Sequence, residues 1–289
     1  MLKFFTDTDC DVTPELARQL DCQLISMPFS IEGETTWPYR DTDEFDLHAF
    51  YDRLRGGVLP NTSALSEQTY LDAFEPHFAR GDDILYVHFS RAMTATFDSM
   101  DRALAQLRQK YPARRLYEVD TKGITTISYT IFREAADLYR AGKTGGEIEA
   151  WAKDAVDRWA MYFFADDLKF FRHSGRVSAL AGTMGTVLGI RPIIYMSAEG
   201  KMVSVGKEKG RVKAMERLVS TVEALGDAVA DHRVVIGHTD CPELARELAD
   251  KLQERFGGKL DIELRPVNPT AGSHCGPNGV GVCFHAKHR

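Results

Sequence analysis

The segment that decides the fold is the opening run Leu2-Lys-Phe-Phe-Thr-Asp-Thr-Asp-Cys-Asp-Val-Thr-Pro-Glu15. Its apolar first residues predict a short buried strand. Thr13 can then cap a helix that begins with Pro14, and Glu15 places a negative charge in the first helical turn. A strand, an acidic loop and a capped helix therefore stand at the start of the chain.

The same alternation of strand and helix continues through the first half. Amphipathic patterns predict helices over residues 66–78 and 94–107, each after a loop rich in hydroxyl side chains. Alternating strands and helices indicate a parallel α/β sheet of the Rossmann-like kind, with helices on its faces. The predicted strands are Leu2–Phe5, Gln23–Ile31, Ile84–His88 and Arg115–Val119.

A Gly-Lys-Thr-Gly-Gly break at residues 142–146 leads into a helical pattern that runs from Glu147 to about Ala160. We place a domain boundary there, with an N-terminal α/β domain over 1–160 and a C-terminal α/β domain over 161–289. The second domain is expected to contain a mixed or antiparallel sheet, with the ligand held between the domains. Its predicted elements are helices over 178–189, 209–229 and 242–255, strands over 192–196, 201–206, 233–238 and 259–265, and a glycine-rich segment over 272–281 before a last strand.

Composition excludes several classes of protein. The 289 residues carry 42 Asp and Glu against 36 Lys and Arg, for a formal net charge of -6. This balance argues against a nucleic-acid partner, which would need clustered basic residues. No apolar run reaches the length of a membrane span, so at most transient contact with a membrane surface is expected. Five scattered cysteines do not suit a disulfide framework, and they favour a cytoplasmic location with reduced thiols.

Asp7, Asp9 and Asp11 alternate directly after the first predicted strand. Their spacing lacks the glycine and glutamate that an EF-hand calcium loop requires. Asp9-Cys-Asp-Val-Thr13 resembles the nucleophile motif of haloacid dehalogenases, so one alternative is a Mg²⁺-dependent phosphohydrolase that uses Asp7 or Asp9. The other interpretation is that the three carboxylates are turn and capping residues.

The C-terminal segment carries residues of the types that bind metals, but no paired Cys-x-x-Cys motif accompanies them. We therefore expect no metal site. The residues concerned are His274, Cys275, Cys283, His285 and His288.

Hydroxyl side chains gather before two predicted helices, at Thr62-Ser63 and at Ser90, Thr94 and Thr96. Helix N-termini carry unpaired N–H groups and partial positive charge, so added hydroxyls there can make a site for a carboxylate or a phosphate. Plain helix capping is the other interpretation. The second half supplies basic groups on flexible backbone, namely His173-Ser-Gly-Arg176, Lys207-Glu-Lys-Gly-Arg211 and His274 between glycines.

Taken in order, these segments resemble the DegV family of two-domain bacterial proteins. The family motifs have counterparts along nearly the whole chain, with Thr94 in place of the usual Ser, Ala95 in place of Gly and an additional Asn278. The matching segments are Thr6-Asp-Thr-Asp-Cys-Asp11, Thr62-Ser-Ala-Leu-Ser66, Ser90-Arg-Ala-Met-Thr-Ala-Thr-Phe97, Ser174-Gly-Arg-Val-Ser178, Leu188-Gly-Ile-Arg-Pro-Ile-Ile194 and His274-Cys-Gly-Pro277.

The resemblance implies a fatty-acid-binding protein without catalysis of its own and without a cofactor. It places one long-chain fatty acid between the domains, with the carboxylate bound by Thr62, Ser63, Thr94 and His274. The bound acid would be presented to a separate ATP-dependent fatty acid kinase, which makes an acyl-phosphate for phospholipid synthesis. An acyl-chain-sensing regulatory module remains a further alternative.

The same resemblance assigns a secondary set of residues to the mouth of the site, where the phosphate or the kinase would lie: Ser90, Ala95, Arg176 and Arg211. Apolar side chains could line the tunnel, although such residues also build ordinary cores. The candidates are Phe29, Met93, Phe97, Phe163, Phe164 and Met184.

Overall fold

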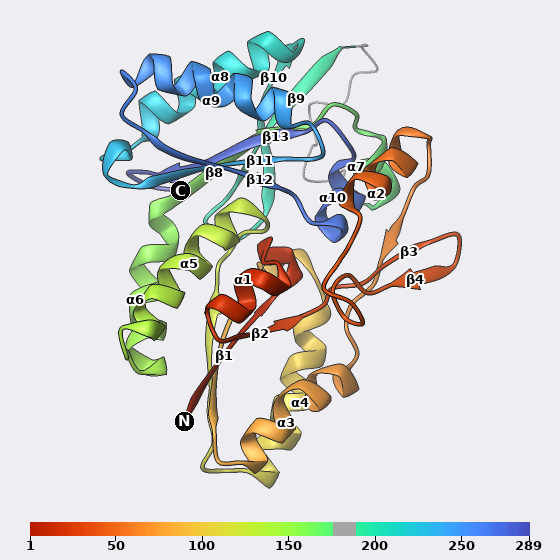
Figure 1. Ribbon diagram of the computed structural model, residues 1–289, viewed down its shortest axis with the longest axis vertical. Helices are drawn as coiled ribbons and strands as arrows, with labels where there is room; N and C mark the ends of the chain where they lie inside the picture. The colour runs from red at the N-terminus through yellow and green to blue at the C-terminus, as the bar shows by residue number, and fades with distance from the viewer. Residues whose placement is uncertain (176–188) are drawn as a thin grey trace.

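The computed structural model describes residues 1–175 and 189–289, and their strands form three sheets (Figure 1). Arg176, Met184 and all but Gly189 of the helix predicted over 178–189 lie outside the described residues. No helix in the described ranges has the length and apolar character needed to cross a bilayer.

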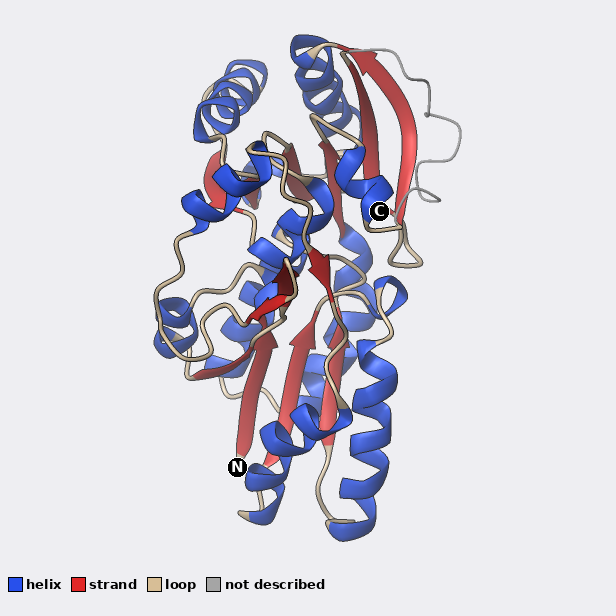
Figure 2. Ribbon diagram, turned by 90° about the vertical axis from the view of Figure 1, so that its right-hand side faces the viewer, coloured by secondary structure: helices blue, strands red, loops and turns tan. Residues whose placement is uncertain are grey.

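The first sheet is parallel throughout and has the order β2-β1-β6-β7. Its strands are β1 (Leu2–Asp7), β2 (Cys22–Ile25), β6 (Asp83–His88) and β7 (Leu116–Asp120). The predicted parallel α/β sheet is thus confirmed, and Figure 2 shows its strands running side by side through the half that holds the N-terminus.

Helices cover both faces of this sheet because successive side chains of each strand point to opposite sides. Phe4 packs with one set of helices, whereas the adjacent Phe5 packs with the other. The first set is α1 (Pro14–Gln19), α5 (Thr126–Arg140) and α6 (Gly145–Ala155). The second set is α3 (Glu67–Ala79) and α4 (Thr96–Lys110). The Thr13 cap and the first-turn Pro14 are present as predicted.

The second sheet is mixed, as expected, in the order β10-β9-β8-β13-β11-β12, and only β11 and β12 run parallel. Helices α8 (Arg211–Leu225) and α9 (Pro242–Arg255) cover its outer face (Figure 1). The strands are β8 (Trp159–Phe164), β9 (Ile190–Met196), β10 (Met202–Lys209), β11 (Arg233–His238), β12 (Asp261–Pro266) and β13 (Val280–His285).

One hydrophobic core joins the two large sheets. Phe132 of α5 shares a buried cluster with Val87 of the first sheet and with Met161 and Val235 of the second. Helix α5 therefore packs on both sheets. The domain division at residue 160 stays a prediction, and it falls within β8.

The single strand predicted over Gln23–Ile31 is wrong. The chain leaves the first sheet after β2 and enters a small antiparallel sheet in the order β4-β3-β5. Pro28 separates the two strands, and proline lacks the N–H that a continuous ladder would need. The strands are β3 (Phe29–Ile31), β4 (Glu34–Thr36) and β5 (Asn61–Thr62), and α2 (Leu47–Arg55) lies between β4 and β5.

Three further predicted boundaries are corrected. The helix expected to reach Ala160 ends at Ala155 and is followed by the short turn η3 (Val156–Arg158). The helix expected over 209–229 is the shorter α8. The glycine-rich segment over 272–281 begins inside α10 (Pro269–Cys275), because Asn268 caps that helix and Pro269 opens it.

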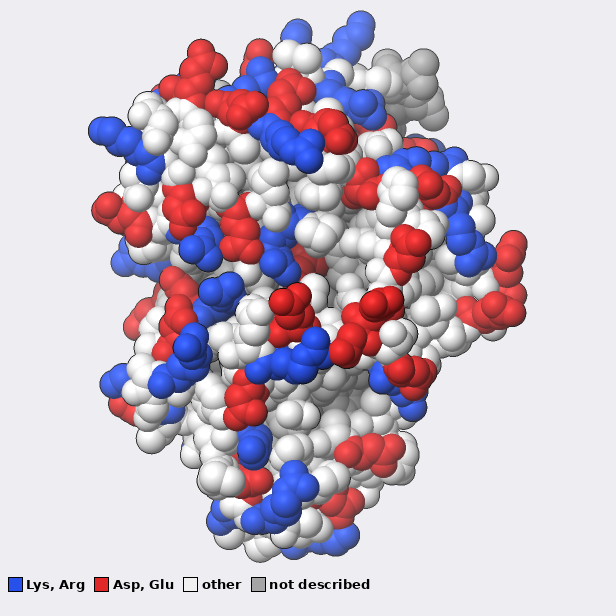
Figure 3. Space-filling view, in the orientation of Figure 1, with Lys and Arg blue, Asp and Glu red and all other residues white. Residues whose placement is uncertain are grey.

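Short helices complete the described chain: η1 (Thr8–Cys10), η2 (Arg91–Met93), η5 (Val229–Asp231) and α7 (Lys169–His173). Acidic and basic side chains are interspersed over the face seen in Figure 3. That face therefore carries no continuous basic track.

Candidate functional site

A cavity of about 300 Å³ lies between the two large sheets. The first half of the chain contributes the loop after β5 and the segment that leads from β6 into α4. The second half contributes the inner face of β8 and the helix α10. The volume is at the lower end of the range of small-molecule sites in proteins.

The predicted head-group residues share this cavity. Thr62, Ser63, Thr94 and His274 all line it. Thr62 Oγ1 lies 3.0 Å from His274 Nε2, which joins β5 to α10. Three hydroxyl groups and an imidazole from distant parts of the sequence therefore border one cavity.

Most of the remaining wall is apolar. Met27, Met93, Met161 and Met202 line the cavity, and Phe163 contributes an aromatic ring from β8. Thioether side chains adapt to irregular ligand shapes because they are unbranched and polarizable. The cavity is therefore built like the site of a ligand with a large apolar part.

The apolar residues named from the sequence divide between wall and core. Met93, Phe163 and Phe164 line the cavity. Phe29 and Phe97 are instead packed in separate hydrophobic clusters of the first half. The sequence does not single out Met27 or Met202 as cavity residues, because only the tertiary fold brings their short segments to the cavity.

Ser90 and Ala95 have different positions. Ser90 is fully buried and does not line the cavity; its Oγ donates to the carbonyl of Gly200 at 2.7 Å and so ties the loop after β6 to the turn between β9 and β10. Ala95 lines the cavity as the residue before α4, with φ -86°. That φ is ordinary for any residue, so alanine fits where the family usually has glycine.

Arg211 lies at the start of α8 and does not line the cavity. Its guanidinium makes two bonds to the Asp166 carboxylate, at 3.0 and 2.8 Å, and Arg191 contacts the same carboxylate at 2.6 Å. These arginines lower the pKa of Asp166 although its partial burial opposes that shift. The role of Arg211 at the mouth stays a prediction, and Arg176 is outside the described residues.

The three alternating aspartates have three different environments. Asp7 accepts the N–H of Asp9 with Oδ1, while its Oδ2 accepts the Tyr86 hydroxyl at 3.1 Å and the N–H of Phe89 at 3.3 Å. Asp11 accepts both the backbone N–H and the side-chain amide of Asn268. Asp7 and Asp11 thus hold loops in place, which is the capping interpretation offered above.

Asp11 positions the helix α10, which lines the cavity. Its carboxylate fixes Asn268, whose own side chain caps α10 by accepting the N–H of Ala271. Thr270 strengthens the attachment by donating to the carbonyl of Met27 at 2.9 Å. Because His274 is in the last turn of α10, these contacts set the place of its imidazole.

Burial dominates the electrostatics of the acidic loop. It raises the pKa of Asp7 to about 6 and the pKa of Asp11 to about 6, against the hydrogen bonds that favour their charged forms. It also raises the pKa of Asp9 well above its ordinary value, and the charges of Asp7 and Asp11 add to that shift. Asp9 itself lines the cavity.

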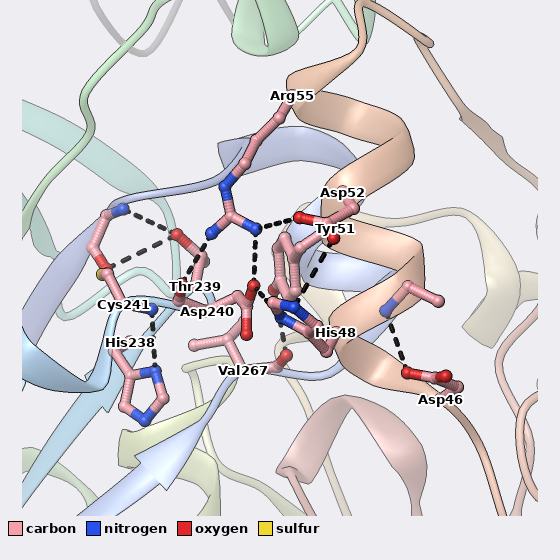
Figure 4. Close-up of polar contacts among 12 residues, drawn as sticks. Asp46, His48, Tyr51, Asp52, Arg55, His238, Thr239, Asp240, Cys241 and Val267 are labelled. Carbon is pink, nitrogen blue, oxygen red and sulfur yellow. Dashed lines mark hydrogen bonds and ion pairs between the residues drawn. The ribbon is translucent and has the colours of Figure 1, made fainter.

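A polar clasp closes α2 onto the second half of the chain (Figure 4). Arg55 contacts the Asp240 carboxylate and its backbone carbonyl, each at 2.6 Å, while His48 Nδ1 lies 2.8 Å from Asp240 Oδ2. Beside the clasp, the Tyr51 hydroxyl donates to the carbonyl of Val267 at 3.0 Å. Val267 lines the cavity, so α2 braces the cavity wall from outside.

Sequence analysis missed this clasp, because its members are separated by 185 and 192 positions in the chain. His48, Asp52 and Asp240 are also the one group of three His, Cys, Asp or Glu side chains in the described ranges with ligand atoms close enough for a metal ion. The guanidinium of Arg55 already pairs with both carboxylates. The C-terminal residues of metal-binding type form no such group in the described ranges: Cys283 is buried in the core between the sheets and His285 stacks on His232.

Comparison with known proteins decides the family. The family model for uncharacterised proteins of the DegV family matches residues 1–287. The chain belongs to the DegV family. A DegV domain-containing protein of Clostridium perfringens is 30% identical over 286 residues, which cover 98% of each chain.

Two solved structures have the same fold. A stearic-acid-binding protein from Eubacterium ventriosum superposes with a TM-score of 0.87 at 18% identity, over 99% of both chains. The fatty acid kinase (Fak) B3 protein from Streptococcus pneumoniae, solved with linoleic acid, gives a TM-score of 0.82 at 16% identity, over 99% of this chain and 100% of that one. The two-domain α/β fold expected from the resemblance is therefore confirmed.

Proposed function

We propose that this DegV protein binds one long-chain fatty acid in the cavity between its sheets. The observation that carries the proposal is the division of the cavity wall into a small hydroxyl and imidazole group and a larger apolar part. A fatty acid has the same division, with one carboxylate and a long hydrocarbon chain. Two proteins of the same fold support the assignment, one described as stearic-acid-binding and one solved with linoleic acid.

The tail would be held by removal of its surface from water. Burial of each methylene is worth about 0.8 kcal/mol, so a chain of many methylenes gains most of its binding free energy from the apolar wall. The methionines at positions 27, 93, 161 and 202 provide such a wall on several sides.

The carboxylate would be held by Thr62, Ser63, Thr94 and His274. Hydroxyl groups donate to a carboxylate, and hydrogen bonds to charged groups are stronger than neutral ones. The N-terminus of α4 adds partial positive charge, and Ala95 has no side chain with which to cap it. A ligand carboxylate can therefore take the place that a capping side chain would fill.

The protein would act as a carrier without catalysis or cofactor of its own, in the cytoplasm. It would present the carboxylate to an ATP-dependent fatty acid kinase, which forms the acyl-phosphate used for phospholipid synthesis. Ser90, Ala95, Arg176 and Arg211 would lie toward the kinase or the transferred phosphate. The Fak B3 relative supports this partner.

No observation favours the phosphohydrolase alternative. Both carboxylate oxygens of Asp7 accept hydrogen bonds from the surrounding loop and core. Asp9 lies among apolar cavity residues and carries a raised pKa, which suits a neutral carboxyl rather than an Mg²⁺ ligand or a nucleophile. A metal-dependent hydrolysis of aryl phosphates that Asp9→Asn abolishes would revive that alternative.

Titration of the delipidated protein with palmitic or oleic acid tests the binding step. We expect saturation at one acid per chain, measured by calorimetry or by displacement of a fluorescent fatty acid. Failure to take up any C14–C20 acid would contradict the proposal. Addition of a fatty acid kinase and ATP to the loaded protein then tests presentation: ADP release that depends on the loaded protein supports a carrier, and its absence with every kinase tried favours an acyl-chain sensor.

A further inference from the structure

Asp9 lines the cavity, and its side chain stabilises no other part of the described fold by a hydrogen bond. It belongs to η1, directly after β1. The residue as a whole is 3% exposed. Its backbone N–H donates to Asp7 and its backbone carbonyl accepts from Thr125 at 2.7 Å. Many other residue types could make these backbone contacts, so the fold does not require an acidic side chain here.

The Oδ1 atom of Asp9 is buried and has no hydrogen-bond partner among the described residues. Buried polar atoms are nearly always paired, since an unpaired one loses its bonds to water and gains nothing in return. Thr6 Oγ1 and Asp11 Oδ2 are also buried without a partner among the described residues, but neither Thr6 nor Asp11 lines the cavity, whereas Asp9 does. An unpaired oxygen on the wall of a ligand cavity therefore indicates a partner that arrives with the ligand.

The surroundings favour the neutral form of Asp9. Burial and the negative charges of Asp7 and Asp11 all raise its pKa. A neutral carboxyl group has one O–H donor and a carbonyl acceptor, so it can pair with a hydroxyl in both directions. Thr125 and Met161 lie on the same stretch of wall, with Thr125 Oγ1 3.9 Å from the Met161 sulfur.

We propose that Asp9 is a specificity-determining residue, which selects a fatty acid that carries a hydroxyl or keto group where its chain passes Asp9. The inference rests on the proposed function. A plain hydrocarbon chain covers the Asp9 carboxyl with methylenes and leaves it unpaired, whereas a hydroxylated chain satisfies it and has its own hydroxyl satisfied. Without Asp9, burial of the same hydroxyl against an apolar wall would be unfavourable.

The test compares stearic acid with 3-, 10- and 12-hydroxystearic acid on the delipidated full chain. Three proteins are titrated: wild type, Asp9→Asn, which keeps hydrogen-bonding groups of the same shape, and Asp9→Leu, which removes them. In the wild type, at least one hydroxy acid is expected to bind about tenfold more tightly than stearic acid. Asp9→Asn retains that preference in part, and Asp9→Leu removes or reverses it.

A wild type that prefers stearic acid to every hydroxy isomer would overturn the inference and leave fatty-acid binding in place. An unchanged preference in Asp9→Leu would overturn it too. A wild type that binds none of the four acids would contradict the proposed function itself, and the inference with it. If Asp9→Leu does not fold by circular dichroism, Asp9→Ala replaces it, because alanine removes the polar group without adding volume.

Discussion

Thr62 Oγ1 and His274 Nε2 lie 3.0 Å apart although their residues are separated by 212 positions. Thr62 is the last residue of β5 in the small β4-β3-β5 sheet and His274 lies in the last turn of α10, so the contact joins two elements that line the cavity. We propose that this pair forms the centre of the carboxylate site.

Removal of hydroxyls from this site is expected to weaken ligand binding without unfolding the protein. In the double variant Thr62→Ala with Thr94→Ala, two hydrogen bonds to a charged group are lost, each worth about 1.5–3 kcal/mol. Affinity for palmitic acid should fall by about a hundredfold or more, as measured by calorimetry. The acyl tail keeps its apolar wall, so residual binding is expected.

The matched control for that double variant is Thr221→Ala. Thr221 lies on α8, where its hydroxyl bonds the carbonyl of Arg217 in the same helix and does not reach the cavity. Its affinity for palmitic acid should equal that of wild type. Equal loss of affinity in Thr221→Ala and in the double variant would argue against the carboxylate site.

Substitution of Gly272 by alanine should destabilise the contact between α2 and α10. A Cβ at Gly272 would meet the Tyr51 hydroxyl oxygen at 2.4 Å and its ring carbon Cζ at 2.8 Å. Overpacking of this kind lowers the free energy of unfolding by about 1–3 kcal/mol, so the midpoint of the unfolding transition should move to a lower urea concentration. Gly206→Ala is the control, since a Cβ there meets no atom within 4 Å; a similar loss in both variants would show that the Tyr51 contact is not the cause.

The raised pKa of Asp9 predicts a specific pH dependence of stability. A carboxyl group whose pKa is higher in the folded state stabilises the fold below its ordinary pKa of 3.8, and that contribution is lost as the pH rises through the raised value. Asp9→Asn mimics the neutral form at every pH. The free energy of unfolding of wild type should therefore fall relative to Asp9→Asn between pH 4 and pH 8.

Chemical denaturation at several pH values in this range measures that difference. Asp7 and Asp11 titrate in both proteins, so their contribution largely cancels in the comparison. A difference that stays constant with pH would mean that Asp9 is not held in its neutral form.

The clasp around Asp240 predicts pH-dependent release of the ligand. Asp240 and Asp52 raise the pKa of His48 above its ordinary 6.5. The ion pair of His48 with Asp240 is therefore formed at pH 6, and it is lost as the pH rises through the raised pKa of His48. Because α2 braces Val267 and α10, dissociation of a fluorescent fatty acid should become faster from pH 6 to pH 9. His48→Gln should remove this dependence.

Arg55→Ala provides the second arm of the clasp test. Arg55 contacts Asp240 at every pH in that range, so its loss should speed dissociation by about two- to fivefold throughout, a modest effect typical of partly exposed ion pairs. Dissociation that is unchanged in both variants would show that the clasp does not control the cavity.

Sequence predicted the parts of the fold that depend on local pattern. Thr13-Pro14-Glu15 began a helix as expected because capping is decided within one turn. The strand predicted over 233–238 and the helix predicted over 242–255 agree with β11 and α9 to the residue. In each case periodicity, flanking breakers and burial all pointed to the same element.

Sequence could not predict features that depend on distant contacts. Apolar residues alternate through the later part of the run Gln23–Ile31, which favours one strand, and although Pro28 interrupts it, only the pairing shows that β2 and β3 belong to different sheets. The hydroxyls before two predicted helices and the family motifs both join Thr62 with Thr94, but the sequence does not reveal that Thr62 lies in the small sheet rather than at the edge of the parallel sheet. The alternate spacing of Asp7, Asp9 and Asp11 does not reveal which of the three carboxylates faces a cavity.

Mass spectrometry of an organic extract of the purified protein tests the binding of a fatty acid most directly. The account predicts one C14–C20 fatty acid per chain, or its uptake when such an acid is added to the delipidated protein. An extract without fatty acid, together with no uptake of any added acid, would contradict the account.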